Sequence, residues 1–488
     1  MLCRTTPAHG KDVRCRIRKF TLSRRVQIFT CHPSVGGLRA YDEAAPDLPG
    51  SADDGKQQHD ASAHLILRMT FEWRAGQNSA ILEPRQLCPA PTAASVVGTD
   101  SRLVELDWLR IGAFGLLMFF HVGLFYAPGN WHVKSPYPQQ WLQPVLEMSS
   151  PWRLSLLFLV AGAATGLSLG SRREWGQIRQ RTVRLLVPLG FGMAIFVLPQ
   201  VYLEVVHKFG YADGYINFLQ RYLVAGPRFC PPEGKMACIT PPNWNHLWFL
   251  GYLWAYTLLL IAVRLIKQGA VEIIDLTRLT SGGRLLWLPL LLFAIERQQL
   301  LFRFPPNNGF VNDWFSHALY LSMFLLGSAF FGHRDDRHGA WAAAVRLRWW
   351  ALGAALLSLL GMRIGLSLAG GWQAFSPAEK QFWLALGAIR HWAPVLAALG
   401  FARLHLRGRD SRARRLMTEA VFPFYLVHQM AIVVGGHHLA RINWPLPLEA
   451  VLIVVFTAVA CFMTWRIGRE VRWLRPLLGI VRRPGKWP

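Results

Sequence analysis

An arginine and a histidine lie within one apolar segment, LDWLRIGAFGLLMFFHVGLFY, at residues 106–126. Arg110 and His121 share one face of a 3.6-residue helix, roughly 16 Å apart along its axis. An ionisable side chain at bilayer depth costs roughly 2.5 kcal/mol or more, so it usually has a function. A guanidinium suits a phosphate-bearing donor, and a neutral imidazole can act as general base on a hydroxyl. The competing interpretations are a snorkelling arginine and a packing histidine.

Further ionisable residues fall in other apolar segments and are candidates for the same site. Glu204, His246, Arg390 and His391 are expected towards the outer side of the membrane and His428 near mid-depth, which predicts a polar cavity open to that side. Glu204 or a residue of another helix is expected to hold the His121 ring.

Arg181 and Arg184 are three positions apart, just before Pro188, and therefore share a helix face. They are either charges that mark the cytoplasmic side of the membrane or a second contact for phosphate. The spacing alone leaves both interpretations open.

The composition indicates an all-α, polytopic membrane protein. Of the 488 residues, 52% are apolar and 17% charged, and 21 Trp and 29 Phe are present. A helix needs about 20 apolar residues to cross a bilayer. Ten segments meet that need, near residues 106–126, 152–170, 184–206, 246–266, 285–303, 313–332, 347–369, 381–404, 418–439 and 447–467.

The basic residues indicate how these segments are oriented. The formal net charge is +25, but Lys and Arg occur in short clusters between apolar segments, which argues against nucleic acid as a partner. The clusters follow every second segment, as in RLHLRGRDSRARR, whereas the alternate connections are poor in Lys and Arg. This alternation predicts ten spans with both termini in the cytoplasm, in a bacterial inner membrane with the lipid bilayer as its surroundings.

Three regions are expected along the chain. Residues 1–100 contain no apolar run of membrane-spanning length and are either a disordered extension or an overlong gene model. Residues 101–470 form the ten-helix domain, and residues 471–488 form a basic cytoplasmic tail. In the longest outward loop, Cys230 and Cys238 are either a disulfide of an oxidising compartment or two unpaired thiols.

Four segments together resemble acyltransferase family 3 of membrane enzymes. Arg110 and His121 match its first-helix arginine–histidine motif, and RTVRLLVP, with Arg181 and Arg184, resembles the entry to its third helix. WNHLWFLGYLW resembles its aromatic segment, and FPFYLVHQ resembles its late Tyr-Leu-x-His segment. These two segments add His246, Trp248, Tyr425 and His428 as substrate-binding candidates. The order and separations also fit, from about residue 103 to 468.

The resemblance implies an acyl-CoA-dependent O-acyltransferase with His121 as the catalytic residue and Arg110 as its motif partner. Within the family the chain most resembles the glucan biosynthesis protein C group, whose namesake succinylates periplasmic glucans. The implied reaction moves an acetyl or succinyl group from cytoplasmic acyl-CoA to a hydroxyl of a periplasmic or cell-envelope glycan. No bound cofactor and no metal is expected. In LLFLVAGAATG, Ala161 stands where many relatives have Ser, so this chain provides no serine hydroxyl at that position.

Two other classes explain parts of the same pattern. A transporter or flippase for a small molecule or lipid-linked sugar accounts for ten spans and intramembrane charges equally well. Transporters commonly have two similar halves, and the sequence shows no such repeat. A non-enzymatic membrane scaffold explains the outer ionisable residues poorly.

Overall fold

Helices make up most of the described chain, which the computed structural model covers at residues 103–168, 174–224, 229–230, 238–266, 276–332, 336 and 338–480. The predicted 1–100 extension and the end of the predicted basic tail, residues 481–488, lie outside the described residues. The helices are α1 (Val104–Tyr126), α2 (Leu142–Ser168), α3 (Glu174–Gly192), η1 (Met193–Val197), α4 (Leu198–Phe209), α5 (Gly214–Leu223), η2 (Asn245–Leu247), α6 (Trp248–Ile266), α7 (Leu276–Thr280), α8 (Arg284–Leu300), α9 (Trp314–Leu326), η3 (Gly327–Phe331), α10 (Ala340–Ala369), η4 (Trp372–Ala374), α11 (Pro377–Leu406), α12 (Arg412–Leu439), η5 (Ala440–Ile442), α13 (Leu446–Glu470) and α14 (Leu474–Leu477).

All ten expected spans fall on helices, which confirms the all-α fold class. Within the described part of the chain, eight helical segments are long and apolar enough to cross a membrane. The expected spans that are not among these eight are α2, which carries Pro151 and Arg153, and α8, which has 17 residues. The eight are Val104–Tyr126, Trp175–Phe209, Asn245–Ile266, Trp314–Phe331, Ala340–Ala369, Pro377–Leu406, Arg412–Ile442 and Leu446–Glu470.

Two helix boundaries differ from the sequence prediction. Helix α2 begins at Leu142, ten residues before the expected start, because Pro151 is accommodated inside the helix. The third span runs without interruption from Trp175 to Phe209. It contains the π-helical turn η1 just before Pro199, a residue that cannot donate the usual hydrogen bond to the carbonyl four positions earlier.

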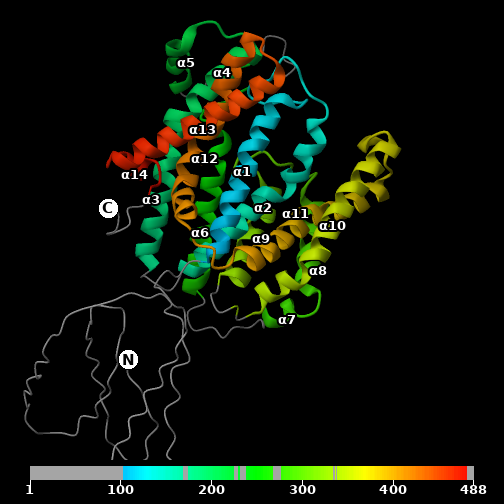
Figure 1. The fold of residues 1–488 in the computed structure, drawn as a ribbon. Coiled ribbons are helices and arrows are strands. Elements are labelled where there is room, and N and C mark those ends of the chain that lie inside the picture. Colours follow the sequence, from blue (N-terminus) through cyan, green and yellow to red (C-terminus); the bar gives the residue numbers. More distant parts are fainter. Residues whose placement is uncertain are drawn as a thin grey trace, which may run out of the picture. The chain divides into compact units, whose positions relative to one another are not determined.

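Helix α1 lies between two groups of packed helices (Figure 1). Leu106 and Ala113 pack into a core formed with α2, α6 and α8–α11. Phe114 and Leu117 pack into a second core formed with helices α3 to α6, α12 and α13. A helix shared by two cores can present side chains to the space between them.

Glycines allow α2 to approach the end of α9 closely. A β-carbon on Gly162 would lie 1.9 Å from the carbonyl oxygen of Phe324, and one on Gly327 would lie 2.0 Å from the carbonyl oxygen of Leu159. Both distances are far below van der Waals contact, so only glycine fits at either position. This close approach explains by packing alone why glycine follows Ala161 at position 162.

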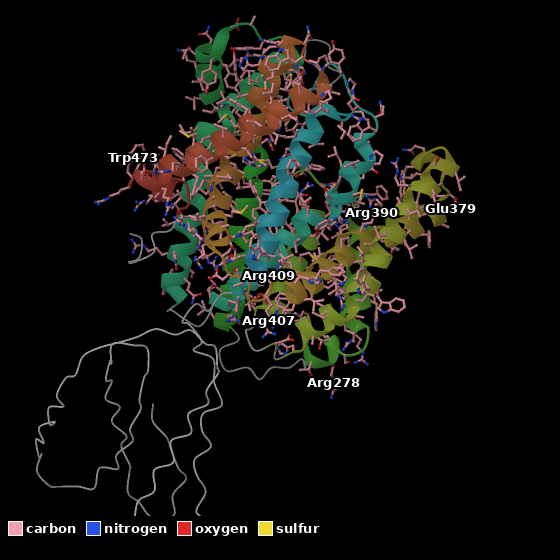
Figure 2. The ribbon with its side chains drawn as sticks, in the orientation of Figure 1. Arg278, Glu379, Arg390, Arg407, Arg409 and Trp473 are labelled. Atoms are coloured by element: carbon pink, nitrogen blue, oxygen red, sulfur yellow. A yellow bond between two sulfur atoms is a disulfide. The ribbon has the colours of Figure 1, made fainter. Side chains whose placement is uncertain are left out.

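The outer surface of the described helices suits a bilayer. Helices α10 and α13 expose large apolar side chains, among them Leu357 and Val451, as expected for a lipid-facing surface. Figure 2 shows Arg278, Arg407 and Arg409 together at one end of the helices, whereas Glu379 lies at the other end of α11. The helices therefore have one end with clustered basic side chains.

Candidate active site

A cavity of about 1110 Å³ lies among α1, α2, α3, α6, α9 and α12. Arg110 and His121 both line it, as the one-face spacing on α1 predicts. Asp107 and Arg415 line the same cavity near the first residues of α1 and α12, and Asn243 and Asn308 line it from the loops that precede η2 and α9. The cavity therefore connects Arg110 with His121.

His121 is held by a second histidine. Its Nδ1 lies 3.0 Å from Nε2 of His428, and Nδ1 of His428 lies 2.9 Å from the carbonyl oxygen of Tyr425. Because a carbonyl oxygen only accepts hydrogen bonds, Nδ1 of His428 carries the proton, and Nε2 of the neutral ring is an acceptor. His121 therefore donates from Nδ1, which leaves the electron pair of its Nε2 available for a proton.

His246 and Tyr425, next to this pair, are joined to each other by two hydrogen bonds. Nε2 of His246 donates to the carbonyl oxygen of Tyr425 at 3.0 Å, and the Tyr425 hydroxyl donates to the carbonyl oxygen of His246 at 2.5 Å. The same Tyr425 carbonyl thus accepts from His246 and from His428. His246, Trp248 and Tyr425 line the cavity, whereas His428 is fully buried behind His121.

The α1–α2 connection covers one side of the His121 ring. The Trp131 ring stacks on the His121 ring with centroids 6.2 Å apart. Lys134 binds the end of α1 by donating from Nζ to the carbonyl oxygens of Leu124, at 2.5 Å, and Ala127. Burial lowers the pKa of Lys134. A lysine at a helix carboxyl end satisfies carbonyls that lack helical partners, so the loop is held in place over the site.

Glu204 does not contact the His121 ring, so the expectation that Glu204 holds this ring is wrong. The alternative, a residue of another helix, is met by His428. Its Oε2 accepts from Nδ1 of His132 at 2.5 Å, and its Oε1 accepts from Lys208 at 2.5 Å. Nε2 of His132 in turn accepts from the side-chain amide of Gln429 at 2.8 Å. Glu204 therefore fixes a different histidine, which also lines the cavity.

Several guanidinium groups surround the cavity at the amino end of α1. Arg110, Arg181, Arg184 and Arg415 all line it. Nη2 of Arg181 donates to the Ser168 hydroxyl at 2.8 Å, so α3 is tied to the end of α2 there. The two arginines before Pro188 therefore face the cavity, an arrangement suited to a phosphate-bearing molecule.

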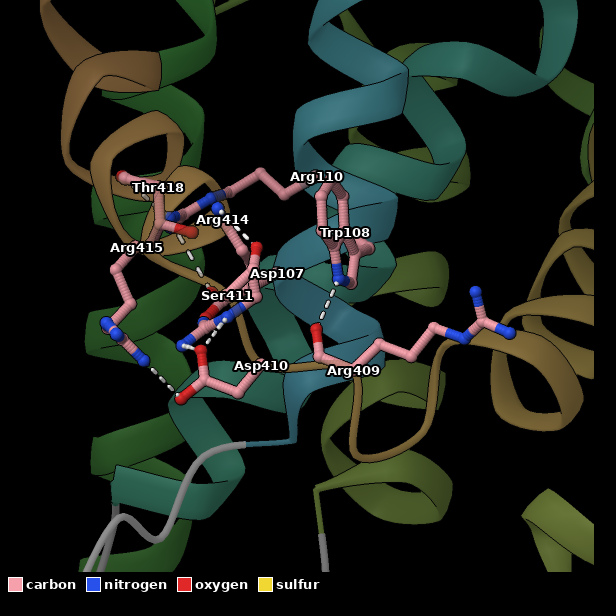
Figure 3. A network of polar contacts seen from close by, with 9 residues as sticks. All are labelled: Asp107, Trp108, Arg110, Arg409, Asp410, Ser411, Arg414, Arg415 and Thr418. Carbon is pink, nitrogen blue, oxygen red and sulfur yellow. Dashed lines mark hydrogen bonds and ion pairs between the residues drawn. The ribbon is translucent and has the colours of Figure 1, made fainter.

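Arg110 is oriented by its own helix and by α12. Its Nη2 donates to the carbonyl oxygen of Thr418 at 3.1 Å and lies 3.8 Å from Oδ1 of Asp107 (Figure 3). The side chain keeps about a third of its surface exposed, so its position is defined while part of the guanidinium faces the cavity.

Arg390 and His391 are placed away from the cavity in the described part of the chain. Nη2 of Arg390 donates to the carbonyl oxygen of Glu147 at 3.0 Å. Nδ1 of His391 donates to the carbonyl oxygen of Pro151 at 2.7 Å, and its Nε2 accepts from Arg297 at 2.9 Å. Because both groups join α11 to α2 and α8, their expected role in substrate binding finds no geometric support.

His132 and Arg153 also line the cavity, although neither is predicted from the sequence as a site residue. His132 is in the α1–α2 connection, where single histidines carry no periodic signal. Arg153 lies next to the expected start of the second span, where a basic residue is usual. The true start of α2 at Leu142 places Arg153 well inside the helix.

The family model described as an acyltransferase domain matches residues 103–466. The chain therefore belongs to acyltransferase family 3 and is a multi-pass membrane protein, and membership indicates transferase activity.

Among its relatives are the glucans biosynthesis protein C of Escherichia coli strain 536, 24% identical over 370 residues, and that of Escherichia coli O1:K1, 23% identical over 378 residues. Each alignment covers 73% of this chain and 90% of the relative. No solved structure matches the chain.

Proposed function

We propose that this protein transfers an acetyl or succinyl group from acyl-CoA to a hydroxyl of a periplasmic or cell-envelope glycan. The observation that carries the proposal is the single cavity lined by both Arg110 and His121, with His121 hydrogen-bonded through its Nδ1. The name of the relatives, glucans biosynthesis protein C, supports a glucan-like acceptor.

The donor enters with its phosphates at the basic end of the cavity. Arg110, Arg181, Arg184 and Arg415 line that end, and guanidinium groups bind phosphate oxygens in pairs. The Arg110–His121 separation of roughly 16 Å, from the helical rise, is similar to the reach of a pantetheine arm. The thioester is thereby brought to His121.

His121 acts as the general base of the transfer. The acceptor hydroxyl oxygen attacks the thioester carbonyl carbon while its proton moves to Nε2 of His121. The carbon–sulfur bond then breaks, and the leaving thiolate takes the proton from His121 as CoA thiol. The ester of the acceptor remains, so each turnover returns the imidazole to its starting form. His428 positions the ring and stabilises its charged form through Nδ1 of His121.

Ten spans with both termini in the cytoplasm fit this direction of transfer, in the inner membrane of a bacterium. Basic residues Arg278, Arg407 and Arg409 gather at one end of the helices, which is the cytoplasmic end by the positive-inside rule. The beginning of α1, with Arg110, has its polar contacts at the same loop, since Trp108 donates to the carbonyl oxygen of Arg409 at 3.0 Å.

Replacing His121 with Ala tests the proposal. We expect the variant to remain in the membrane at wild-type amount and to lose acyl transfer, measured by mass analysis of cell-envelope glycans. Ester retained in the variant would contradict the assignment. A deletion strain separates this enzyme from an exporter, because loss of an enzyme removes the ester, whereas loss of an exporter moves an unmodified compound to another compartment.

A further inference from the structure

Arg153 is a cation inside the cavity for which the described residues offer no anion. It is 3% exposed and lines the cavity from α2. Its Nη1 donates to the Ser149 hydroxyl at 3.2 Å, and its Nε has no hydrogen-bond partner. Among the described residues no carboxylate pairs with it.

The guanidinium lies beside the reacting histidine. Its Cζ is 3.7 Å from the centroid of the Phe120 ring, and that centroid is 5.7 Å from the centroid of the His121 ring. Phe120 precedes His121 on α1, so Arg153 of α2 reaches the same level of the cavity. Taking a charge out of water is costly, and one contact with an aromatic ring offsets only part of that cost. A ligand anion would balance the remainder.

The guanidinium nitrogens of Arg153 that make no described hydrogen bond indicate how the anion binds. Nη1 donates a hydrogen bond to the Ser149 hydroxyl, whereas Nε makes no hydrogen bond and no described residue accepts one from Nη2. Nε and Nη2 lie on one edge of the planar group, and this edge can donate two parallel hydrogen bonds to oxygen.

We propose that Arg153 binds a negatively charged oxygen of the acyl group while His121 carries out the transfer, an inference that rests on the proposed function. The oxygen has two sources. It is the free carboxylate of a dicarboxylic acyl group, present from the moment the donor binds. Alternatively it is the thioester carbonyl oxygen, which becomes negative when the acceptor hydroxyl attacks and neutral again when the carbon–sulfur bond breaks.

Succinyl-CoA and butyryl-CoA distinguish these sources, because the two acyl groups have the same length of carbon chain and only succinyl ends in a carboxylate. We would measure donor affinity by titration of the purified full-length protein. We would measure turnover by release of CoA thiol in the presence of a glucose oligosaccharide. The variants are Arg153→Gln and Arg153→Lys, each checked for a monodisperse profile. Arg363→Gln is the matched control, since its guanidinium pairs with Glu147 outside the cavity.

A carboxylate source predicts that Arg153→Gln weakens succinyl-CoA binding tenfold or more and leaves butyryl-CoA binding unchanged. An oxyanion source predicts unchanged affinities and a turnover reduced a hundredfold or more with both donors. In either case Arg153→Lys recovers part of the loss, and the control resembles wild type. Wild-type affinity and turnover in Arg153→Gln would overturn the inference. His121→Ala keeps donor affinity and loses turnover, so a failure of the proposed function is recognised separately.

Discussion

At the scale of single residues, the site depends on where two imidazole protons lie. His428 presents Nε2 to His121 only because its Nδ1 is committed to the carbonyl oxygen of Tyr425. A histidine whose second nitrogen is free can adopt either tautomer, and the wrong one cannot act as base towards the cavity. The backbone carbonyl of Tyr425 thus sets which nitrogen of His121 is protonated, because it acts through the ring of His428 that lies between them.

Replacing His428 with Phe removes the acceptor and retains a ring of similar size. We expect kcat to fall by about two to four orders of magnitude, as when the orienting partner of a catalytic histidine is lost. The KM for acyl-CoA should change little, because Arg110 and its neighbours are untouched, and the pH profile of kcat should shift. His438→Phe, an exposed position on the same helix, is the control. An unaltered kcat and pH profile would show that His428 has no positioning role.

At the scale of elements, the registration of α1 against α12 is set by charged groups near their amino ends. Arg414 is almost fully buried and pairs with Asp107 of α1 and with Asp410, which precedes α12 (Figure 3). Asp410 also accepts from Arg415 at 2.8 Å. The Ser411 hydroxyl accepts from the backbone amide of Arg414 at 3.1 Å and begins the helix. These contacts align α1 with the helix that carries His428.

Arg414→Met should destabilise the protein by about 3 kcal/mol, because it removes the buried cation between Asp107 and Asp410 and leaves them only the partly exposed Arg110 and Arg415. The thermal unfolding midpoint of the purified protein is the measurement, and a fall of several degrees is expected. Arg466→Met is the matched control, since Arg466 pairs with Glu470 on the exposed surface of α13 and should matter by less than about 1 kcal/mol. Equal effects of the two substitutions would contradict a special role for Arg414.

The same network makes a pH prediction. Burial alone would raise the pKa of Asp410, but the hydrogen bonds from Arg414 and Arg415 outweigh it and lower this pKa. A lowered pKa in the folded state means that the stabilisation is present above the unfolded value, about 3.9, and is lost as the pH falls through the folded value. Asp410→Asn should therefore lower the unfolding midpoint slightly at pH 7, and the difference from wild type should begin to shrink as the pH falls below about 4 and vanish once Asp410 is protonated in the folded state. A constant difference across this range would exclude the ion pairs as its cause.

At the scale of the whole molecule, the direction of the proposed transfer depends on which loops lie on each side of the membrane. Cys230 and Cys238 form a disulfide, which settles the two alternatives left by the sequence. Disulfides persist in oxidising compartments such as the bacterial periplasm. The bond joins the ends of the loop beside the isolated bridge between Phe229 and Ile239. The outward position of the loop between α5 and α6 stays a prediction, which a disulfide favours.

Cys230→Ser should leave Cys238 open to a membrane-impermeant maleimide added to intact cells. Mass analysis of the labelled protein is the measurement. Cys461, which is buried within α13, serves as the internal control and should remain unlabelled. Labelling of Cys238 only after the cells are broken would reverse the orientation and place the basic ends of the helices outside.

Much of the architecture could be predicted from local sequence. Runs of apolar residues identify helices because each span must satisfy its own backbone in lipid, and every expected span is helical. The shared face of Arg110 and His121 follows from helical geometry alone. The structure adds that this face meets the cavity, a point that depends on which neighbours pack against α1.

The sequence by itself determined the helices, the paired residues on α1 and the family motifs, because these depend on spacing within one chain segment. Only the tertiary structure decided that His428 holds His121, that Glu204 holds His132, and that Arg390 and His391 tie helices together. Each of these partners is distant in sequence, and many residues are compatible with each position. Hydrogen-bond partners are selected by packing, which the order of residues along the chain does not express.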